Sequence, residues 1–357
     1  MDSYRKRPGN GLRHFLLALQ FFTCLPMPAR MAAWVGFDPV MMKAAAGHFP
    51  GVGWLVGLVA AGALGVASML LGTANPATMV AVVVLSIVAT VGFTGAFHED
   101  GLADVGDALG GFAPPEKALQ IMKDSRLGSY GTLTLVLALL LKICLLTALL
   151  PLGLWPTVAA SLSAHVLSRW APLWLIRWLR YVGSTRLIGK NDLPATRAHT
   201  DTSPGGCAGN GSNGNDITGT TVSTCCGGAG GRAGAGPRIR RASAGADLGQ
   251  EKSAHTDTAQ EVVADASKSR GLAEDISRGA LTTALLWVLP AWLLVGLVFG
   301  WATMLLVLAI GSMLTWRLGL FFLRRIGGVT GDCLGATQQL NELACYLVLV
   351  VCTGVGH

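Results

Sequence analysis

Two long apolar stretches without a single charged residue most constrain what this chain can fold into. They run from 51 to 72 and from 78 to 97, and neither contains Lys, Arg, Asp or Glu. Each is long enough to cross a hydrocarbon core of about 30 Å as a helix. Hydrophobic residues form 52% of the 357 positions and charged residues only 13%, which argues against an ordinary soluble globular protein.

Further apolar segments predict an all-α fold, a polytopic membrane helix bundle with about seven transmembrane helices. These segments lie at 129–150, 155–179, 280–299, 302–323 and 336–355. The apolar run at 15–22 follows several basic residues but precedes no convincing cleavage site, so we expect an interfacial or re-entrant helix there.

The distribution of charge predicts a cytoplasmic N-terminus and a C-terminus on the outer side. The connections near 73–77, 151–156 and 300–301 carry no charged residue. The alternate connections, at 98–128, 180–279 and 324–335, hold nearly all the charge outside the N-terminus. Since Lys and Arg accumulate in cytoplasmic loops, the net charge of +7 is mainly a signal of topology and is no evidence for nucleic-acid binding.

The composition changes abruptly between 183 and 279, where Gly, Ser, Thr, Ala and Asp dominate. This stretch has too few large apolar residues to offset the entropy of an ordered chain. We therefore predict a disordered cytoplasmic insertion between two membrane halves, 1–182 with four spans and 280–357 with three.

Three aspartates follow the second long apolar stretch at helical spacing. Asp100, Asp104 and Asp107 are related as i, i+4 and i+7, which places them within an arc of roughly 60° on a helix. Like charges so close together favour a bound cation, and Mg²⁺ prefers such oxygen ligands. The alternative is a solvated acidic helix end. Glu99 lies off this arc and is expected to be solvated.

Small residues separate the three aspartates, Gly101 and Gly106 among them. We interpret them as leaving room for a bulky ligand. Lys123 and Arg126 lie just before the next apolar segment, where they suit phosphate binding, although a positive cytoplasmic loop would explain them equally well.

A second polar cluster opens the last apolar segment. Asp332, Gln339 and Glu342 draw a polar stripe along the predicted helix, and such groups at membrane depth normally face a cavity or a partner. His165 and Arg169, spaced i and i+4 in the fourth span, form another polar pair, for which a structural hydrogen bond between helices is at least as reasonable as substrate contact. The predicted topology places all the loop clusters on the cytoplasmic side.

Taken together and in this order, the motifs resemble the cobalamin synthase family, also called adenosylcobinamide-GDP ribazoletransferases. The matching stretches include FLLALQFFT from Phe15, HEDGLADVGDALGG from His98, MKDSRLGSYG from Met122, SRWAP from Ser168 and GGVTGDCLGATQQLNEL from Gly327. The resemblance covers nearly the whole chain apart from 183–279, a connection that is normally much shorter in the family.

The resemblance implies a transferase that joins adenosylcobinamide-GDP to α-ribazole, or its 5′-phosphate, with release of GMP and a requirement for Mg²⁺. It also implies the roles of individual residues: Asp100, Asp104 and Asp107 bind the metal; Lys123, Arg126, Arg169 and Gln339 bind substrate or phosphate; Asp332 binds metal or orients the nucleophile; His98 or Asp124 acts as base. The expected location is the cell inner membrane, with the lipid bilayer as surroundings, the active site facing the cytoplasm, and other cobalamin pathway enzymes as candidate partners.

Two other classes of function remain as alternatives. Membrane alcohol phosphotransferases of the CDP-alcohol type also use an aspartate cluster and Mg²⁺, but Val105 stands where their pattern has Arg. A transporter with an acidic ion site is disfavoured because the chain shows no internal repeat and its charges lie at helix ends.

Overall fold

The computed structural model describes residues 10–36, 39–182 and 276–354. The predicted insertion at 183–279 lies outside the described residues except for 276–279. Within the described ranges the regular elements are helices, and the only strand-like feature there is an isolated bridge between Tyr181 and Val329.

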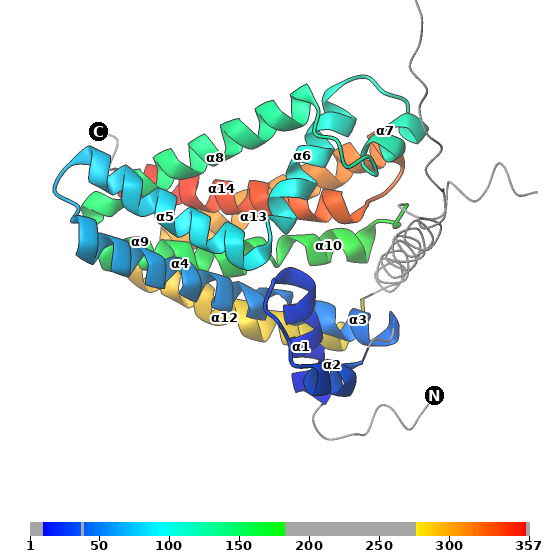
Figure 1. Cartoon of the computed structure of the whole chain (residues 1–357), viewed down its shortest axis with the longest axis horizontal. Helices are drawn as coiled ribbons and strands as arrows, with labels where there is room; N and C mark the ends of the chain where they lie inside the picture. The colour runs from blue at the N-terminus through cyan, green and yellow to red at the C-terminus, as the bar shows by residue number, and fades with distance from the viewer. Residues whose placement is uncertain (1–9, 37–38, 183–275, 355–357) are drawn as a thin grey trace, which may run out of the picture. The chain divides into compact units, whose positions relative to one another are not determined.

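The helices follow one another with short connections (Figure 1). In chain order they are α1 (Asn10–Phe22), α2 (Ala29–Val35), α3 (Pro39–Ala46), α4 (Phe49–Leu71), α5 (Pro76–Thr94), α6 (Phe97–Gly110), α7 (Pro115–Ile121), α8 (Ser129–Leu149), the 3-10 turn η2 (Leu150–Leu152), α9 (Leu154–Ser168), α10 (Ala171–Trp178), α12 (Arg278–Phe299), α13 (Trp301–Ile326) and α14 (Gly331–Thr353).

Five of the helices in the described ranges are long and apolar enough to cross a membrane. They are α4, α5, α8 together with η2, α12 and α13. The chain is therefore a polytopic helical membrane protein, as the apolar segments predict. Helix α1, at 13 residues, is shorter than a span.

Two of the seven predicted spans are not among these five helices, so a count of seven stays a prediction. The segment predicted at 155–179 is divided into α9 and α10 at Arg169 and Trp170. The 15 residues of α9 rise only about 22 Å, less than the thickness of a hydrocarbon core. Helix α14 is 23 residues long, but Gln338, Gln339, Asn341 and Glu342 interrupt its apolar character.

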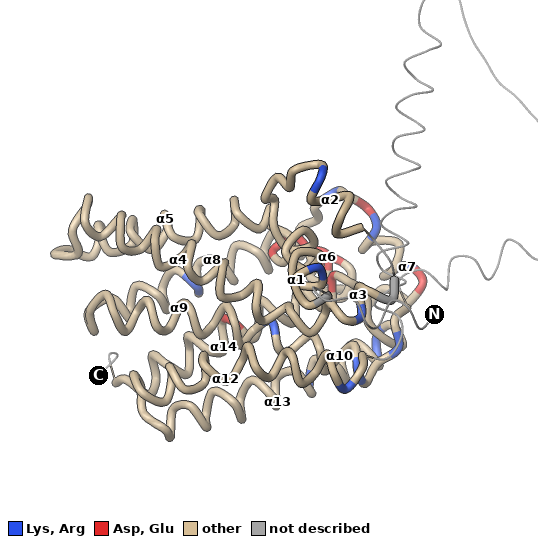
Figure 2. Tube along the Cα trace, turned by 90° about the horizontal axis from the view of Figure 1, so that it is seen from below, with Lys and Arg blue, Asp and Glu red and all other residues tan. Residues whose placement is uncertain are grey.

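Most charged residues of the described ranges gather at one end of the helix bundle, near α3, α6, α7 and the end of α10 (Figure 2). The connections between α4 and α5 and between α12 and α13 lie at the opposite end (Figure 1). We call the first the charged end. This separation is the pattern from which a cytoplasmic charged end is predicted.

Topology reporters test that orientation directly. Fusions at Pro76 and at Gly153 are expected to give periplasmic signals because both residues lie in connections without charged residues, at the end of the bundle opposite the charged end. A fusion at Phe112, between α6 and α7 at the charged end, serves as the control and is expected to give a cytoplasmic signal. Cytoplasmic signals at both Pro76 and Gly153 would reverse the orientation.

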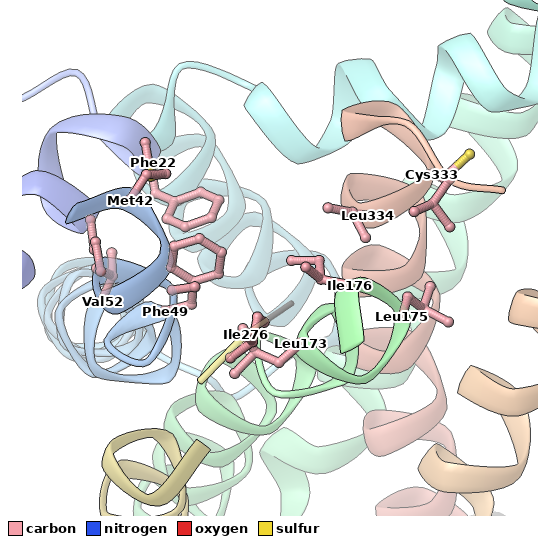
Figure 3. Packing of buried hydrophobic residues seen from close by; sticks show 14 of the residues in the cluster. Phe22, Met42, Phe49, Val52, Leu173, Leu175, Ile176, Ile276, Cys333 and Leu334 are labelled. Atoms are coloured by element: carbon pink, nitrogen blue, oxygen red, sulfur yellow. The ribbon is translucent and has the colours of Figure 1, made fainter. Parts of the chain in front are cut away.

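Small residues allow α4 to pack tightly on α9. A Cβ atom on Gly53 would lie 2.8 Å from the Cα of Val166, and one on Gly57 would lie 3.0 Å from the Cα of Leu162. The two glycines form a GxxxG pattern, which brings helix backbones together where lipid supplies no hydrophobic drive. At the charged end, apolar side chains of α1, α4, α10 and α14 form a buried cluster that supports the start of α14 (Figure 3).

Candidate functional site

The acidic helix α6 crosses the start of α14 at very short range. A Cβ atom on Gly101 would lie 3.1 Å from the Cα of Asp332, and one on Gly335 would lie 3.5 Å from the Cα of His98. A side chain on Gly106 would meet Thr134 of α8 at 2.7 Å. The interpretation of Gly101 and Gly106 as room for a bulky ligand is therefore wrong. They let α6 pack against α14 and α8, because a side chain would hold the helices apart.

This crossing brings carboxylates from two distant parts of the chain together around Asp104. Burial, together with the neighbouring charges of Asp332, Asp100 and Asp107, raises the pKa of Asp104 from 3.8 to about 7. Asp100 is exposed, whereas Asp104, Asp107 and Asp332 are half-buried. Four carboxylates thus repel one another at the charged end, which is the electrostatic setting that a bound cation relieves.

Besides its predicted role in metal binding, Asp107 forms hydrogen bonds that its spacing did not predict. Its Oδ2 accepts a hydrogen bond from the backbone N–H of Gly128 at 2.6 Å, and its Oδ1 accepts one from Gly131 at 2.8 Å. A carboxylate at a helix N-terminus satisfies free N–H groups and complements the helix dipole. Asp107 therefore fastens the start of α8 to the acidic helix.

Replacement of Gly131 by alanine tests this junction. The new Cβ would overlap the Asp107 carboxylate and lie 2.7 Å from the carbonyl oxygen of Ala103, so α8 would have to move away from α6. We expect Gly131→Ala to lose most turnover and to lower the thermal midpoint in detergent. Gly65→Ala in α4, where nothing lies within 4 Å, is the matched control and should change neither. Normal turnover of Gly131→Ala would show that the junction tolerates displacement.

Within the described residues, no group of three or more His, Cys, Asp or Glu side chains is positioned to hold a metal ion by itself. Mg²⁺ does not need such a cage, because it usually takes one or two carboxylates and completes its shell with water and substrate phosphates. The half-buried Asp104 and its acidic neighbours fit that mode of binding.

The loop between α7 and α8 carries the predicted phosphate ligands on its surface. Lys123 is exposed, and the side chain of Arg126 is 87% exposed. Arg126 Nη2 donates to Asp124 Oδ2 at 2.6 Å, and these hydrogen bonds lower the pKa of Asp124. The loop is tied to α14 because Met122 Sδ lies 3.6 Å from the hydroxyl of Thr330. The cations therefore lie on a loop that contacts the start of the helix carrying Asp332.

Glu99 departs from its expected place. It is 8% exposed, and its Oε1 accepts a hydrogen bond from Gln339 Nε2 at 3.0 Å. The prediction of a solvated Glu99 is wrong because Glu99 faces α14, and the packing of α6 on that helix excludes water there. Gln339, predicted to bind substrate, is 5% exposed and holds Glu99.

His98 and Arg169 lie together in the interior, each 3% exposed. Burial, followed by the nearby positive charge of Arg169, places the pKa of His98 well below its usual 6.5. Arg169 Nη1 donates to the carbonyl oxygen of His165 at 2.8 Å, a hydrogen bond within the end of α9 and not one between helices.

A buried polar network lies in the middle of the bundle, and the sequence predicted only some of its members. Lys142 Nζ lies 2.6 Å from Glu342 Oε1, and His165 Nδ1 lies 3.5 Å from Glu342 Oε2. Gln338 Nε2 donates both to Glu342 Oε2 and to the hydroxyl of Ser168, each at 2.9 Å. Lys142, an isolated charge inside an apolar segment, was the available signal. Glu342 is thus committed to partners inside the bundle.

The fold and the site define the class: a polytopic helical membrane protein with carboxylates and cations gathered at one end of its bundle. The sequence model of the family described as cobalamin-5-phosphate synthase matches residues 14–202 and 258–350. The chain belongs to this family.

Curated relatives agree with the family match. A Polaromonas sp. protein (strain JS666) named adenosylcobinamide-GDP ribazoletransferase is 36% identical over 353 residues, which cover 95% of this chain and 97% of the relative. A protein of the same name from Albidiferax ferrireducens is 37% identical over 355 residues, covering 95% and 98%. One from Shewanella piezotolerans is 32% identical over 351 residues, covering 98% of each. No solved structure matches the chain.

Proposed function

We propose that this chain transfers the cobinamide phosphoryl group of adenosylcobinamide-GDP to α-ribazole, or to its 5′-phosphate, and releases GMP. The family and the names of its relatives support this reaction. The structural observation that carries the proposal is the close packing of α6 on the start of α14 at Gly101 and Asp332, which brings the charge of Asp332 near enough to raise the pKa of Asp104, beside a loop with exposed cations.

The reaction is a phosphoryl transfer. An oxygen–phosphorus bond forms between the ribazole hydroxyl and the phosphorus attached to cobinamide, while the bond from that phosphorus to the oxygen of GMP breaks. A Mg²⁺ ion held at this site would supply positive charge to offset the charge that develops on the diphosphate. Asp100 and Asp104 are the ligands we propose for it, with Asp107 close by and already bonded to the start of α8.

The remaining residues bind and orient the substrates. Lys123 and Arg126 would attract the diphosphate, and Asp124 holds the Arg126 guanidinium in place. Asp124 and His98 both have lowered pKa values, which weakens either as a general base. The charge of Asp332 acts on Asp104, and Asp332 would therefore orient the attacking hydroxyl and accept its proton.

A cytoplasmic charged end would place this site on the side of the membrane where nucleotides occur. We therefore propose a location in the cell inner membrane with the site facing the cytoplasm. Association with other enzymes of the cobalamin pathway stays a prediction.

Purified protein in detergent tests the reaction. Incubation with adenosylcobinamide-GDP, α-ribazole and Mg²⁺ is expected to release GMP and form adenosylcobalamin in equal amounts, and chelation of the metal should stop both. Release of CMP from a CDP-alcohol, with no GMP from adenosylcobinamide-GDP, would instead indicate an alcohol phosphotransferase.

A further inference from the structure

A narrow aromatic cavity opens beside the carboxylates at the charged end. Four phenylalanines wall it: Phe21 and Phe22 at the end of α1, Phe49 at the start of α4 and Phe97 at the start of α6. The rings of Phe22 and Phe49 point towards Leu334 of α14, which lines the opposite side (Figure 3).

The rings form an ordered box. Phe22 and Phe49 meet edge to face with their centroids 4.5 Å apart, and Phe21 meets Phe97 in the same manner at 5.3 Å. The imidazole of His98 stacks on Phe22 at 5.3 Å with an interplanar angle of 11°. Such an arrangement presents faces and edges to which a planar aromatic ring can be added.

Two buried polar side chains reach the cavity with bonding capacity to spare. Arg169 is 3% exposed and Gln338 is 1% exposed, and both line the cavity. Within the described part of the chain, Arg169 Nε and Gln338 Oε1 have no hydrogen-bond partner. The side-chain nitrogen Nε2 of Gln338 donates to Ser168 and Glu342, and Arg169 Nη1 donates to the carbonyl oxygen of His165. An unpaired buried donor or acceptor costs about 1–3 kcal/mol, so an unpaired donor and an unpaired acceptor on two residues that line the same cavity point to a ligand that completes them.

The cavity ends next to the residues proposed for phosphoryl transfer. Gly331, Leu334, Gly335 and Gln338 follow the i, i+3, i+4, i+7 pattern and form the face of α14 that lines it. Asp332 belongs to the same helical turn, with its backbone against Gly101 of α6. A nucleoside whose base occupied the cavity would therefore have its sugar beside the carboxylates.

We propose that this cavity binds the heterocyclic base of the nucleoside substrate, a planar and mostly apolar two-ring base such as the dimethylated benzimidazole of α-ribazole. The inference rests on the proposed function and assigns the nucleophile's binding site within it. Arg169 Nε–H donates to the ring nitrogen that bears no substituent, and Gln338 Oε1 accepts from a sugar hydroxyl. The methyl groups lie among the phenylalanines.

Guanine, the other base in the reaction, suits this cavity poorly. Its edge carries several N–H donors and several acceptors, most of which would face phenylalanine rings and lose their hydrogen bonds to water. The guanosine diphosphate portion is better served by the exposed cations Lys123 and Arg126 on the loop before α8.

The base has to displace one wall to enter. The free volume is about 30 Å³, room for about two water molecules. Phe97 is 38% exposed and is therefore the wall that can swing outwards at least cost, whereas Phe22 and Phe49 are buried at 7% and 3%.

Equilibrium binding of α-ribazole to the full-length protein in detergent, without Mg²⁺ or adenosylcobinamide-GDP, tests the assignment. Phe97→Ala is expected to raise the Kd for α-ribazole about tenfold or more and to leave the Kd for GDP unchanged, because it removes a stacking wall. Phe97→Leu, which keeps most of the volume, should give a smaller rise. Phe112→Ala removes a ring that is 101% exposed and should change neither Kd.

A ligand analogue tests the hydrogen bond on the wild-type protein, independently of any effect on folding. The riboside of dimethylindole, which has C–H in place of the free ring nitrogen, should bind at least about tenfold more weakly than α-ribazole because Arg169 Nε then stays unpaired. Equal binding of the two, with an unchanged α-ribazole Kd in Phe97→Ala, would overturn the assignment. Displacement of α-ribazole by guanosine with loss of GDP binding in Phe97→Ala would assign the cavity to guanine instead.

The two measurements, GMP release and α-ribazole binding, distinguish failure of the cavity assignment from failure of the proposed reaction. Release of GMP by the wild-type protein together with an unchanged α-ribazole Kd in Phe97→Ala rejects the cavity assignment alone. Binding of α-ribazole that depends on Phe97, without any release of GMP, supports the cavity and rejects the proposed reaction.

Discussion

Asp104→Asn is expected to lower turnover by orders of magnitude while the protein still inserts into the membrane. Asparagine keeps the size of the side chain but removes the charge that would neutralise a cation among Asp100, Asp107 and Asp332. Raising the Mg²⁺ concentration should recover part of the loss. GMP release measured over a range of Mg²⁺ concentrations checks both points. Near-normal turnover with an unchanged metal requirement would contradict the proposed site.

The same substitution should make the metal-free protein less sensitive to pH. The folded protein holds the Asp104 proton up to a pKa of about 7, whereas the unfolded chain releases it near 3.8. The folded state binds more protons in this window, so stability falls as the pH rises from about 4 to about 7. Asparagine carries no charge at any pH, so the loss of stability that comes from Asp104 should be absent in Asp104→Asn.

Thermal midpoints in detergent and EDTA at pH 5 and pH 8 measure that effect. The midpoint should fall less in Asp104→Asn than in the wild-type protein. Glu116→Gln on α7 removes an exposed carboxylate away from the cluster and serves as the control, with a wild-type response in both turnover and midpoint. An equal fall of the thermal midpoint in Asp104→Asn and in the wild-type protein would show that repulsion among the carboxylates does not affect stability.

Glu342→Gln is expected to destabilise the bundle severely. Lys142 Nζ lies 2.6 Å from Glu342 Oε1, and both side chains are almost completely buried between helices. Loss of one partner leaves an unpaired charge at membrane depth, which costs about 3–5 kcal/mol. The thermal midpoint in detergent and the yield of monodisperse protein should both fall sharply.

A double substitution separates this role from catalysis. Glu342→Gln combined with Lys142→Met removes both members of the ion pair, and it should restore most of the stability that Glu342→Gln alone loses. The rescued protein should also show a normal Mg²⁺ requirement, because Glu342 faces Lys142 and His165 and lies away from the aspartates. A rescue of stability with a changed metal requirement would make Glu342 part of the metal site.

The helical membrane class and the position of the acidic helix were predictable from the sequence. The stretches 51–72 and 78–97 carry no charge, and a bilayer offers no partner for backbone polar groups, so a helix is the available conformation. The i, i+4, i+7 spacing of Asp100, Asp104 and Asp107 depends on one helix alone, and α6 does span Phe97–Gly110.

The partners of these residues were decided only by the tertiary structure. Spacing along one helix does not tell which helix lies opposite, so the burial of Glu99 against Gln339 could not be predicted. The same holds for Asp107, whose oxygens bind the N–H groups of Gly128 and Gly131 on another helix. Identical residues and spacings are compatible with many helix arrangements, and close backbone contacts such as Gly101 with Asp332 select one of them, because each requires a small residue on one helix and a matching partner on the other.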